Sequence, residues 1–271
     1  MVRMINEVSM SSCLFTHTPG ADTGVLANVD MFLAGGVNWM ELSPGSVGTD
    51  KEMDALEKSG IKIWSVHGVM GLDVISPDPA VREAEVERAY QHALKCARFA
   101  PCPLVEHYLN RHSDPEVGKR FRDSVEKLYE KVSRLGYILG IETAPYKPLQ
   151  YDRHPYSSEI AEFVRSFGKD DLQMTVDINH SNLAEDLVET AKNTRGLVKN
   201  VHISNNYGKI EDHNPPQDGV IDIKRAFDAL RENGYTGPCN LEFRFPGADT
   251  IPTVELIRDV RQYVEKLLWD K

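Results

Sequence analysis

Short apolar runs alternate with longer amphipathic segments along most of the 271-residue chain. The runs are rich in Val, Ile and Leu and have the length of buried strands, whereas the segments between them repeat apolar positions with helical spacing. The strands that we predict span residues 8–15, 37–42, 61–66, 103–108, 137–143, 172–178, 198–204 and 239–243. The clearest predicted helices span residues 80–99, 114–135, 157–167, 183–194, 223–233 and 251–269.

Strands that alternate with helices in this way predict a parallel sheet of the α/β class, and eight of them are typical of a (β/α)8 TIM barrel. Gly60, Gly136 and Gly168 each stand shortly before a predicted strand, where glycine commonly ends a helix. The competing architecture is an open doubly wound sheet, which usually carries a G-x-G-x-x-G loop after its first strand. No such loop follows residues 8–15, so we expect a single barrel domain over residues 1–271.

Acidic residues outnumber basic ones, since 41 Asp and Glu against 31 Lys and Arg give a net charge of −10. This balance argues against a nucleic-acid partner or an anionic membrane surface, both of which need a basic face. The four cysteines are scattered without a metal-binding or disulfide spacing. No apolar run reaches the roughly 18 residues of a membrane span or resembles a signal peptide. We therefore expect a cytoplasmic protein with a small-molecule substrate.

Residues that bind metals or transfer protons stand at the carboxyl ends of the predicted strands. In a barrel these ends meet on one face together with the loops that follow them, and this face carries the chemistry. The residues at or just after these ends are His17, Glu41, His67, His107, Glu142, Asp177 with His180, His202, and Glu242 with Arg244. The pattern therefore predicts one polar site at that face.

The last four strands end in three carboxylates and one imidazole, namely Glu142, Asp177, His202 and Glu242. An unpaired charge at the end of a buried strand is costly, and three carboxylates around one point repel each other unless a cation compensates them. Oxygen ligands together with a neutral histidine suit Mn²⁺, Mg²⁺, Co²⁺ or Zn²⁺. The alternative is that each residue is separately hydrogen-bonded to a loop or paired with an Arg or Lys.

Further candidates flank this group of four. His180 follows the sixth strand closely and is placed to face the same site. His67 and His107 either bind the substrate or satisfy nearby backbone groups. Arg244, just past the last strand, suits a substrate carboxylate or phosphate, or else a surface ion pair. Glu41 either lines the pocket or anchors a loop.

Recognisable motifs occur at the strand ends and in the loops after them. They are GVNWMEL at 36–42, VH at 66–67, LGIE at 139–142, VDINH at 176–180, VHI at 201–203, EDHNPPQDGVID at 211–222, GYTG at 234–237 and LE at 241–242. In their order and spacing they resemble the xylose isomerase-like TIM-barrel superfamily, the group of sugar phosphate isomerases and epimerases that also includes endonuclease IV. The resemblance covers nearly the whole chain.

The resemblance implies that Glu142, Asp177, His202 and Glu242 bind one divalent metal ion. It also implies that the two glutamates move protons on opposite faces of a substrate carbon, and that His180 contacts substrate hydroxyls or the metal's outer shell. We expect further substrate contacts from His67, His107, His213, Arg244 and Glu41. The chain departs from the family pattern at 204–207 and 216–219, in the loop after the seventh strand, so the identity of the substrate stays open.

The resulting hypothesis is a metal-dependent isomerase or epimerase that acts on a sugar, sugar acid, sugar phosphate, inosose or small hydroxy-ketone. A carboxylate removes a proton next to a carbonyl, and the metal stabilises the enediolate that forms. Return of the proton on the opposite face gives epimerisation, and return to the neighbouring carbon gives aldose–ketose isomerisation. The sequence does not decide between these outcomes, and it leaves a homo-oligomer open.

Three other functions stay under consideration. A metal-dependent polyol dehydratase or lyase would share the first step, whereas a non-catalytic binding barrel would predict a disrupted ligand set. A multinuclear zinc phosphodiester hydrolase of the endonuclease IV kind is opposed by the net charge of −10 and by the lack of basic loops. Its ligands would be His67, His107, Glu142, Asp177, His180, His202, Glu211, His213 and Glu242.

Overall fold

The computed structural model describes residues 4–16, 18, 20–145, 147, 149–245 and 250–270. Its strands form a parallel barrel in the order β7-β6-β5-β4-β3-β2-β1-β8. They are β1 (Val8–Ser11), β2 (Trp39–Leu42), β3 (Lys62–His67), β4 (Pro103–His107), β5 (Ile138–Glu142), β6 (Leu172–Asp177), β7 (Val198–His202) and β8 (Cys239–Leu241). The predicted (β/α)8 TIM barrel is therefore confirmed.

The barrel closes between β7 and β8, just beyond the end of β7. The backbone N–H of Ile203 donates to the carbonyl of Asn240 over 2.9 Å, and the N–H of Glu242 donates to the carbonyl of Ile203 over 3.1 Å. Closure of a sheet in this way removes its open edges. It also brings the carboxyl ends of strands that are distant in the sequence to the same side of the molecule.

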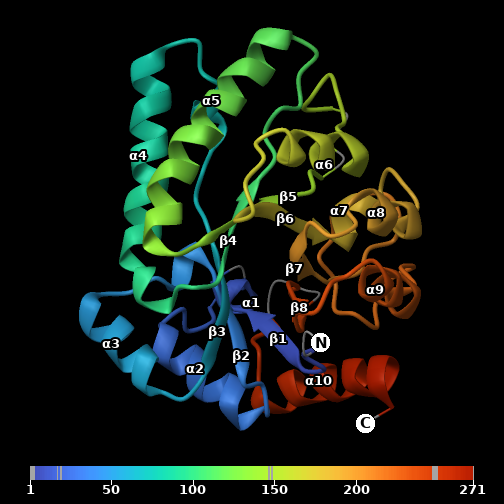
Figure 1. The fold of residues 1–271 in the computed structure, drawn as a ribbon. Coiled ribbons are helices and arrows are strands. Elements are labelled where there is room, and N and C mark those ends of the chain that lie inside the picture. Colours follow the sequence, from blue (N-terminus) through green and yellow to red (C-terminus); the bar gives the residue numbers. More distant parts are fainter. Residues whose placement is uncertain are drawn as a thin grey trace.

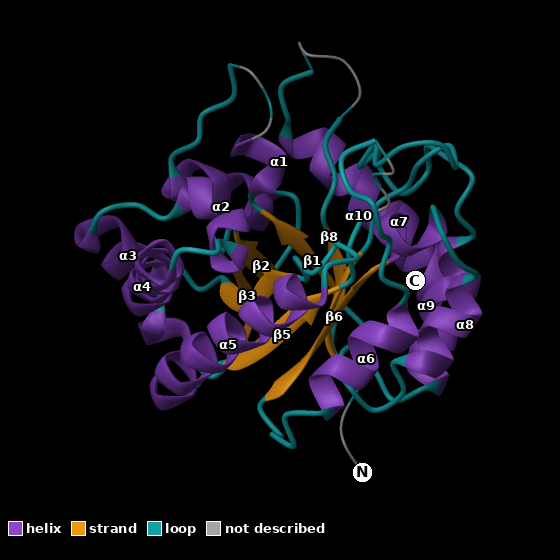
Figure 2. Ribbon diagram, turned by 90° about the horizontal axis from the view of Figure 1, so that it is seen from above, coloured by secondary structure: helices purple, strands orange, loops and turns teal. Residues whose placement is uncertain are grey.

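Helices surround the strands, as Figures 1 and 2 show. They lie in the connections between consecutive strands, except α10, which follows β8. The helices are α1 (Cys13–Thr16), α2 (Val25–Ala34), α3 (Asp50–Lys58), α4 (Pro79–Lys95), α5 (Pro115–Val132), α6 (Ser157–Arg165), α7 (Ile178–Asn182), α8 (Leu187–Asn193), α9 (Ile223–Glu232) and α10 (Val254–Trp269). Short 3₁₀ turns lie at Pro44–Ser46, Leu72–Ile75, Ala97–Phe99 and Ser133–Leu135.

Local sequence signals determine several helix ends. Asp78 and Asp114 each precede a proline, and each side chain accepts a backbone N–H of the first turn over 2.9 Å, at the starts of α4 and α5. Gly60, Gly136 and Gly168 have φ angles of 88°, 90° and 60°. Glycine adopts this left-handed conformation at little cost, so these three predicted helix stops are confirmed.

The first strand is shorter than the prediction of 8–15. β1 ends at Ser11, and the next residues form the short helix α1. The N–H of Phe15 donates to the carbonyl of Ser12 over 3.1 Å, and the Phe15 ring packs edge-on against Phe32 with 5.3 Å between centroids. A strand and a helical turn can both bury a short apolar run, so periodicity alone does not separate them.

The connection after β6 also differs from the prediction of one helix at 183–194. β6 ends at Asp177, and two helices, α7 and α8, follow it. Asp177 Oδ1 accepts the backbone N–H groups of Asn179 and His180 over 2.6 and 3.1 Å. Aspartate is a preferred residue at helix starts, so the chain turns directly after the strand and carries His180 over the barrel.

All four cysteines are buried, and none is bonded to another. Burial raises the pKa of Cys96 and Cys102 to about 12, which keeps these thiols protonated and unreactive. Among the described residues, no helix has both the length and the apolar character that a membrane crossing requires.

Candidate active site

The four residues at the ends of the last four strands meet at one point. The ligand atoms of Glu142, Asp177, His202 and Glu242 all lie within 4.8 Å of one another. Glu142, Asp177 and His202 have no exposed surface, and Glu242 is 9% exposed. Buried carboxylates at this spacing repel each other strongly unless positive charge compensates them. The fold therefore brings together the four residues that the predicted strand ends indicated.

His202 lies at the centre of this group. Its Nδ1 is 2.7 Å from Glu142 Oε1 and 3.0 Å from Glu242 Oε2, and its Nε2 is 2.9 Å from Glu41 Oε2. Burial lowers the pKa of His202, but Glu242, Glu41 and Glu142 outweigh burial and raise this pKa well above its ordinary value. In the absence of a metal ion, a proton on the imidazole therefore supplies the compensating charge.

Glu41 lies beneath the site rather than in the cavity wall. It has no exposed surface, and its Oε2 accepts hydrogen bonds from Ser65 Oγ at 2.6 Å, Asn240 Nδ2 at 3.0 Å and Asn200 Nδ2 at 3.2 Å. The expectation that Glu41 contacts the substrate does not match this position, because β2 continues past it and places it one layer deeper. Its contact with His202 instead holds the imidazole in one orientation.

The donor atoms present fit a divalent cation. Among the described residues, Glu142 Oε2 and Asp177 Oδ2 are buried side-chain oxygens that accept no hydrogen bond. Burial raises the pKa of Asp177 to about 6, so its carboxylate is still ionised at neutral pH. Mn²⁺, Co²⁺ and Zn²⁺ bind both carboxylate oxygens and imidazole nitrogens, so the three carboxylates and the imidazole suit each of these ions. Mg²⁺ prefers oxygen ligands and would be bound by the carboxylates.

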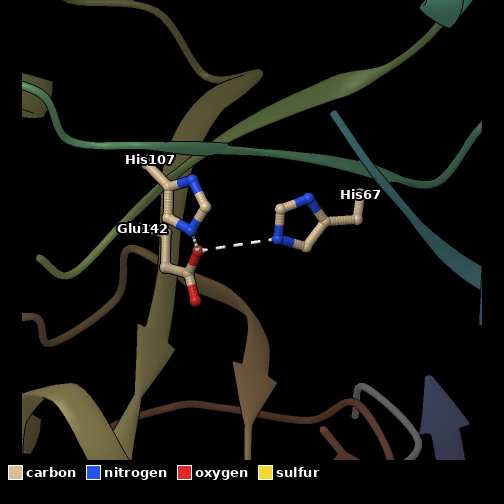
Figure 3. A group of neighbouring side chains, drawn as sticks. All are labelled: His67, His107 and Glu142. Carbon is tan, nitrogen blue, oxygen red and sulfur yellow. Dashed lines mark ion pairs between the residues drawn. The ribbon is translucent and has the colours of Figure 1, made fainter. Parts of the chain in front are cut away.

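Two histidines from the third and fourth strands face the same glutamate (Figure 3). His107 Nε2 is 3.2 Å and His67 Nε2 is 4.0 Å from Glu142 Oε2, and His67 Nε2 is also 3.9 Å from Glu242 Oε1. Burial lowers the pKa of His107 to about 4, so its imidazole is neutral at pH 7. The His107 ring can therefore donate or accept a hydrogen bond, or bind a metal. Burial lowers the pKa of His67, but Glu242 and Glu142 outweigh burial and raise it above the usual value.

A third group stands on the other side of Asp177. His180 Nε2 is 3.4 Å from Asp177 Oδ2 and 3.3 Å from Glu211 Oε1, and His213 Nε2 is 3.0 Å from the same Glu211 oxygen. Burial raises the pKa of Glu211, but hydrogen bonds from His180 and His213 outweigh it and lower this pKa far below the usual range. Glu211 thus belongs to the site, although only the hydrolase hypothesis included it.

A cavity of about 970 Å³ opens above these groups at the carboxyl ends of the strands. This volume is near the upper end of the roughly 300–1,000 Å³ that is typical of small-molecule sites. Most of the predicted substrate-binding residues line it, namely His67, His107, His180, His213 and Arg244, together with Glu242. Loop residues that the prediction did not include also line it, among them Ser43, Lys147, Gln150 and Lys209.

A polar layer below the site was not among the sequence-based predictions. Asn200 and Asn240 stand two residues before His202 and Glu242, so strand alternation turns them to the same barrel face. This spacing was the signal that could have identified them as partners of Glu41. The strand-end residue His17 lies outside the residues that the structure describes.

Comparison with known proteins places this arrangement in a family. The sequence model of the xylose isomerase-like TIM barrels matches residues 31–267. L-ribulose-5-phosphate 3-epimerase UlaE of Shigella flexneri serotype 5b is 23% identical over 213 residues, which are 76% of this chain and 72% of the relative. An uncharacterized protein of Methanocaldococcus jannaschii, MJ1188, is 24% identical over 208 residues, 73% of this chain and 74% of its own.

Solved structures of epimerases have the same fold. An L-ribulose 3-epimerase superposes with a TM-score of 0.80 at 16% identity, over 97% of this chain and 95% of the other. The 3-keto-D-glucoside 4-epimerase YcjR of E. coli gives 0.76 at 16% identity, over 96% and 99%. At these identities the likeness concerns the fold alone. The family match, which extends over most of the sequence, is the stronger finding: this chain belongs to the xylose isomerase-like TIM barrels.

Proposed function

We propose that the chain is a divalent-metal-dependent sugar epimerase or isomerase. The observation that carries the proposal is the pair of buried carboxylates, Glu142 and Glu242, which lie 2.7 and 3.0 Å from the same nitrogen of His202 beneath an open cavity. The names of a related sequence and of several similar structures, which are sugar epimerases, support the same class of reaction.

The metal ion would be held by Glu142, Asp177, His202 and Glu242. When bound, it would supply positive charge that stabilises negative charge on a substrate oxygen and makes the neighbouring C–H more acidic. This help is needed because the carboxylates are weak bases. Burial raises the pKa of Glu142, but His202 and His107 outweigh burial and lower it to about 2.

The two glutamates would move the proton. Glu142 ends β5 and Glu242 follows β8, so the carboxylates reach the substrate from strands three positions apart in the barrel. If one removes a proton from a carbon and the other delivers a proton to the opposite face, the configuration inverts. If the same carboxylate returns the proton to the adjacent carbon, an aldose and a ketose interconvert. His67 and His107 would hydrogen-bond the substrate hydroxyls above them.

Deuterium exchange tests this proposal. The Mn²⁺-loaded protein is incubated in D₂O with ketopentoses and ketohexoses, and NMR follows the carbons that flank the carbonyl. We expect a substrate for which one deuterium enters at the carbon that inverts or receives the proton. Loss of a hydroxyl group in the product would instead identify a polyol dehydratase or lyase. Exchange that persists in a Glu142→Gln/Glu242→Gln double variant would contradict the roles of the two carboxylates.

The two outer ligand groups favour a second candidate, a multinuclear metal phosphodiester hydrolase. His67, His107 and Glu142 form one group, and Asp177, His180 and His213 form another, each with ligand atoms within 4.8 Å. Glu142 and Asp177 also belong to the central group, so neighbouring ions would share ligands. The net charge of −10 still argues against a nucleic-acid substrate.

Metal content separates the two candidates. Elemental analysis after dialysis is expected to find one ion per chain for the epimerase or isomerase. Two or three ions per chain, together with hydrolysis of bis(4-nitrophenyl) phosphate, would favour the hydrolase. A His107→Gln variant that loses one ion per chain would locate the additional ion at the group shown in Figure 3.

A further inference from the structure

Three basic side chains gather on one wall of the cavity, around the loop between β7 and α9. Lys209 belongs to this loop, Lys147 follows β5, and Arg244 follows β8, and all three line the cavity. Lys147 Nζ is 2.9 Å from Glu211 Oε2 in the loop, and the backbone N–H of Arg244 donates to the carbonyl of His213 over 2.9 Å. The fold thus assembles a basic wall that single loops in the sequence did not indicate.

The three cations differ in their partners. Lys147 is neutralised by Glu211, which also contacts His180 and His213. The Arg244 Nε donates to the backbone carbonyl of Asp212 over 3.4 Å, a contact that orients the guanidinium without neutralising it. Within the described part of the chain, no carboxylate oxygen lies within 4 Å of the charged nitrogens of Lys209 or Arg244.

The cavity therefore has two chemically distinct regions. Its floor consists of carboxylates and imidazoles suited to a cation, whereas one wall presents the exposed cations Lys209 and Arg244. Neutral hydroxyls gain little from such charges, but a phosphate or carboxylate forms charge-assisted hydrogen bonds with them. Arginine in particular matches the planar geometry of oxyanions with its fork of N–H donors.

We propose that the substrate is an anionic sugar, whose terminal phosphate or carboxylate binds Lys209 and Arg244 while its carbonyl end lies over Glu142 and Glu242. The assignment rests on the proposed function and names the substrate class of the same site. A cavity of about 970 Å³ accommodates a sugar together with such a group. The relatives do not decide the matter, since UlaE is named for a phosphorylated sugar and the similar structures are named for free sugars.

Binding of inorganic phosphate tests the basic wall without any turnover. Calorimetric titration of the Mn²⁺-loaded protein is compared with a Lys209→Met/Arg244→Met double variant, for which we expect about 10- to 100-fold weaker binding. Phosphate that coordinates the ion directly would bind the variant as tightly as the wild type, and that result would overturn the proposal. Acetate, titrated in parallel, shows whether a carboxylate is held by the same two side chains.

A matched control separates local contacts from net charge. The Lys58→Met/Arg134→Met double variant removes the same two charges from exposed positions at the end of α3 and in the turn after α5. Its affinity for phosphate is expected to equal that of the wild type. An equal loss of affinity in this control would mean that the phosphate senses only the overall charge, and would overturn the assignment to Lys209 and Arg244.

Kinetics on matched substrates then distinguish the two proposals. The ratio of kcat/KM for a ketopentose phosphate to that for the free ketopentose is expected to fall about 10- to 100-fold in the Lys209→Met/Arg244→Met variant, through KM. Exchange on free ketoses with an unchanged ratio would support the epimerase proposal and contradict the proposed anion binding by Lys209 and Arg244. Phosphate binding that depends on both residues, without exchange on any ketose, would support anion binding by Lys209 and Arg244 and contradict the epimerase proposal.

Discussion

The first half of the barrel (β1–β4) and the second half (β5–β8) both have polar residues at the ends of their strands, but these residues have different surroundings. The second half buries its ligand atoms at one point, and leaves carboxylate oxygens of Glu142 and Asp177 without hydrogen bonds. The first half supplies His67 and His107, which open to the cavity, and Glu41, which lies below the site. The second half is thus arranged to hold a charged species, whereas the first half supports and covers it.

Glu41 and Glu242 show how far this difference goes. Both are glutamates at the ends of strands, and both contact the imidazole of His202, but at opposite nitrogens. Ser65, Asn200 and Asn240 donate hydrogen bonds to Glu41, which lines no part of the cavity, whereas Glu242 lines it. The same residue type at the ends of two strands can therefore support a buried histidine from below or face the cavity, and its depth in the barrel decides which.

The largest expected effect concerns the second half. Glu142→Gln and Glu242→Gln each remove a carboxylate that we propose to transfer the proton, and each is expected to lower kcat at least about 1,000-fold. Steady-state kinetics on the substrate found by deuterium exchange would measure this loss. Glu130→Gln, an exposed change on α5, is the matched control and should be neutral. Activity near the wild-type value in either site variant would contradict the proposed proton transfer by that glutamate, and with it the difference in role between the two halves.

The next prediction concerns the support of His202 from below. Glu41→Gln keeps the shape of the side chain but removes the charge that fixes the imidazole, so Mn²⁺ affinity is expected to fall about 10- to 100-fold. Calorimetric titration of Mn²⁺ measures the change, and circular dichroism checks that the fold is intact. If the affinity stays at the wild-type value, Glu41 contributes to barrel packing and not to the metal site.

The charge state of the second half predicts a pH dependence. Burial opposes a charge on His202, but Glu242, Glu41 and Glu142 raise its pKa well above the usual value, so the metal-free ring is protonated at pH 7. A bound ion must displace this proton, so affinity rises with pH, about tenfold per unit while one proton leaves. This rise in metal affinity is expected above about pH 6, where Asp177 is ionised. Chelator-competition titrations from pH 6.5 to 8.5 would reveal a flat profile if His202 is not a ligand.

The smallest expected effect belongs to the first half. His107→Gln retains a hydrogen-bonding group beside Glu142 and is expected to raise KM by less than about tenfold, since one neutral hydrogen bond contributes roughly 0.5–1.5 kcal/mol. Mn²⁺ affinity should stay within about twofold of the wild type if His107 only contacts substrate. A large loss of metal would place His107 among the ligands and make the two halves more alike.

Much of the fold could be predicted from local signals. The strand positions follow from apolar runs of the right length, and the helix stops at Gly60, Gly136 and Gly168 follow from glycine's freedom at positive φ. The errors lie where local signals are ambiguous. The apolar residues of α1 are buried as a helical turn rather than as strand, and Asp177 starts a helix directly after β6. Tertiary packing decides such cases.

The sequence by itself determined the barrel and the residues at its carboxyl-terminal face. Local patterns along the chain indicate the length of each strand, its alternation with helices and the order in which the strands follow one another. It thereby also selected the set Glu142, Asp177, His202 and Glu242, which the fold brings within 4.8 Å. Only the tertiary structure decided the depth of Glu41, the contacts of Glu211 with His180 and His213, and the gathering of basic residues around one loop. These depend on barrel closure and on loop contacts between residues far apart in the chain, and no local pattern encodes such contacts.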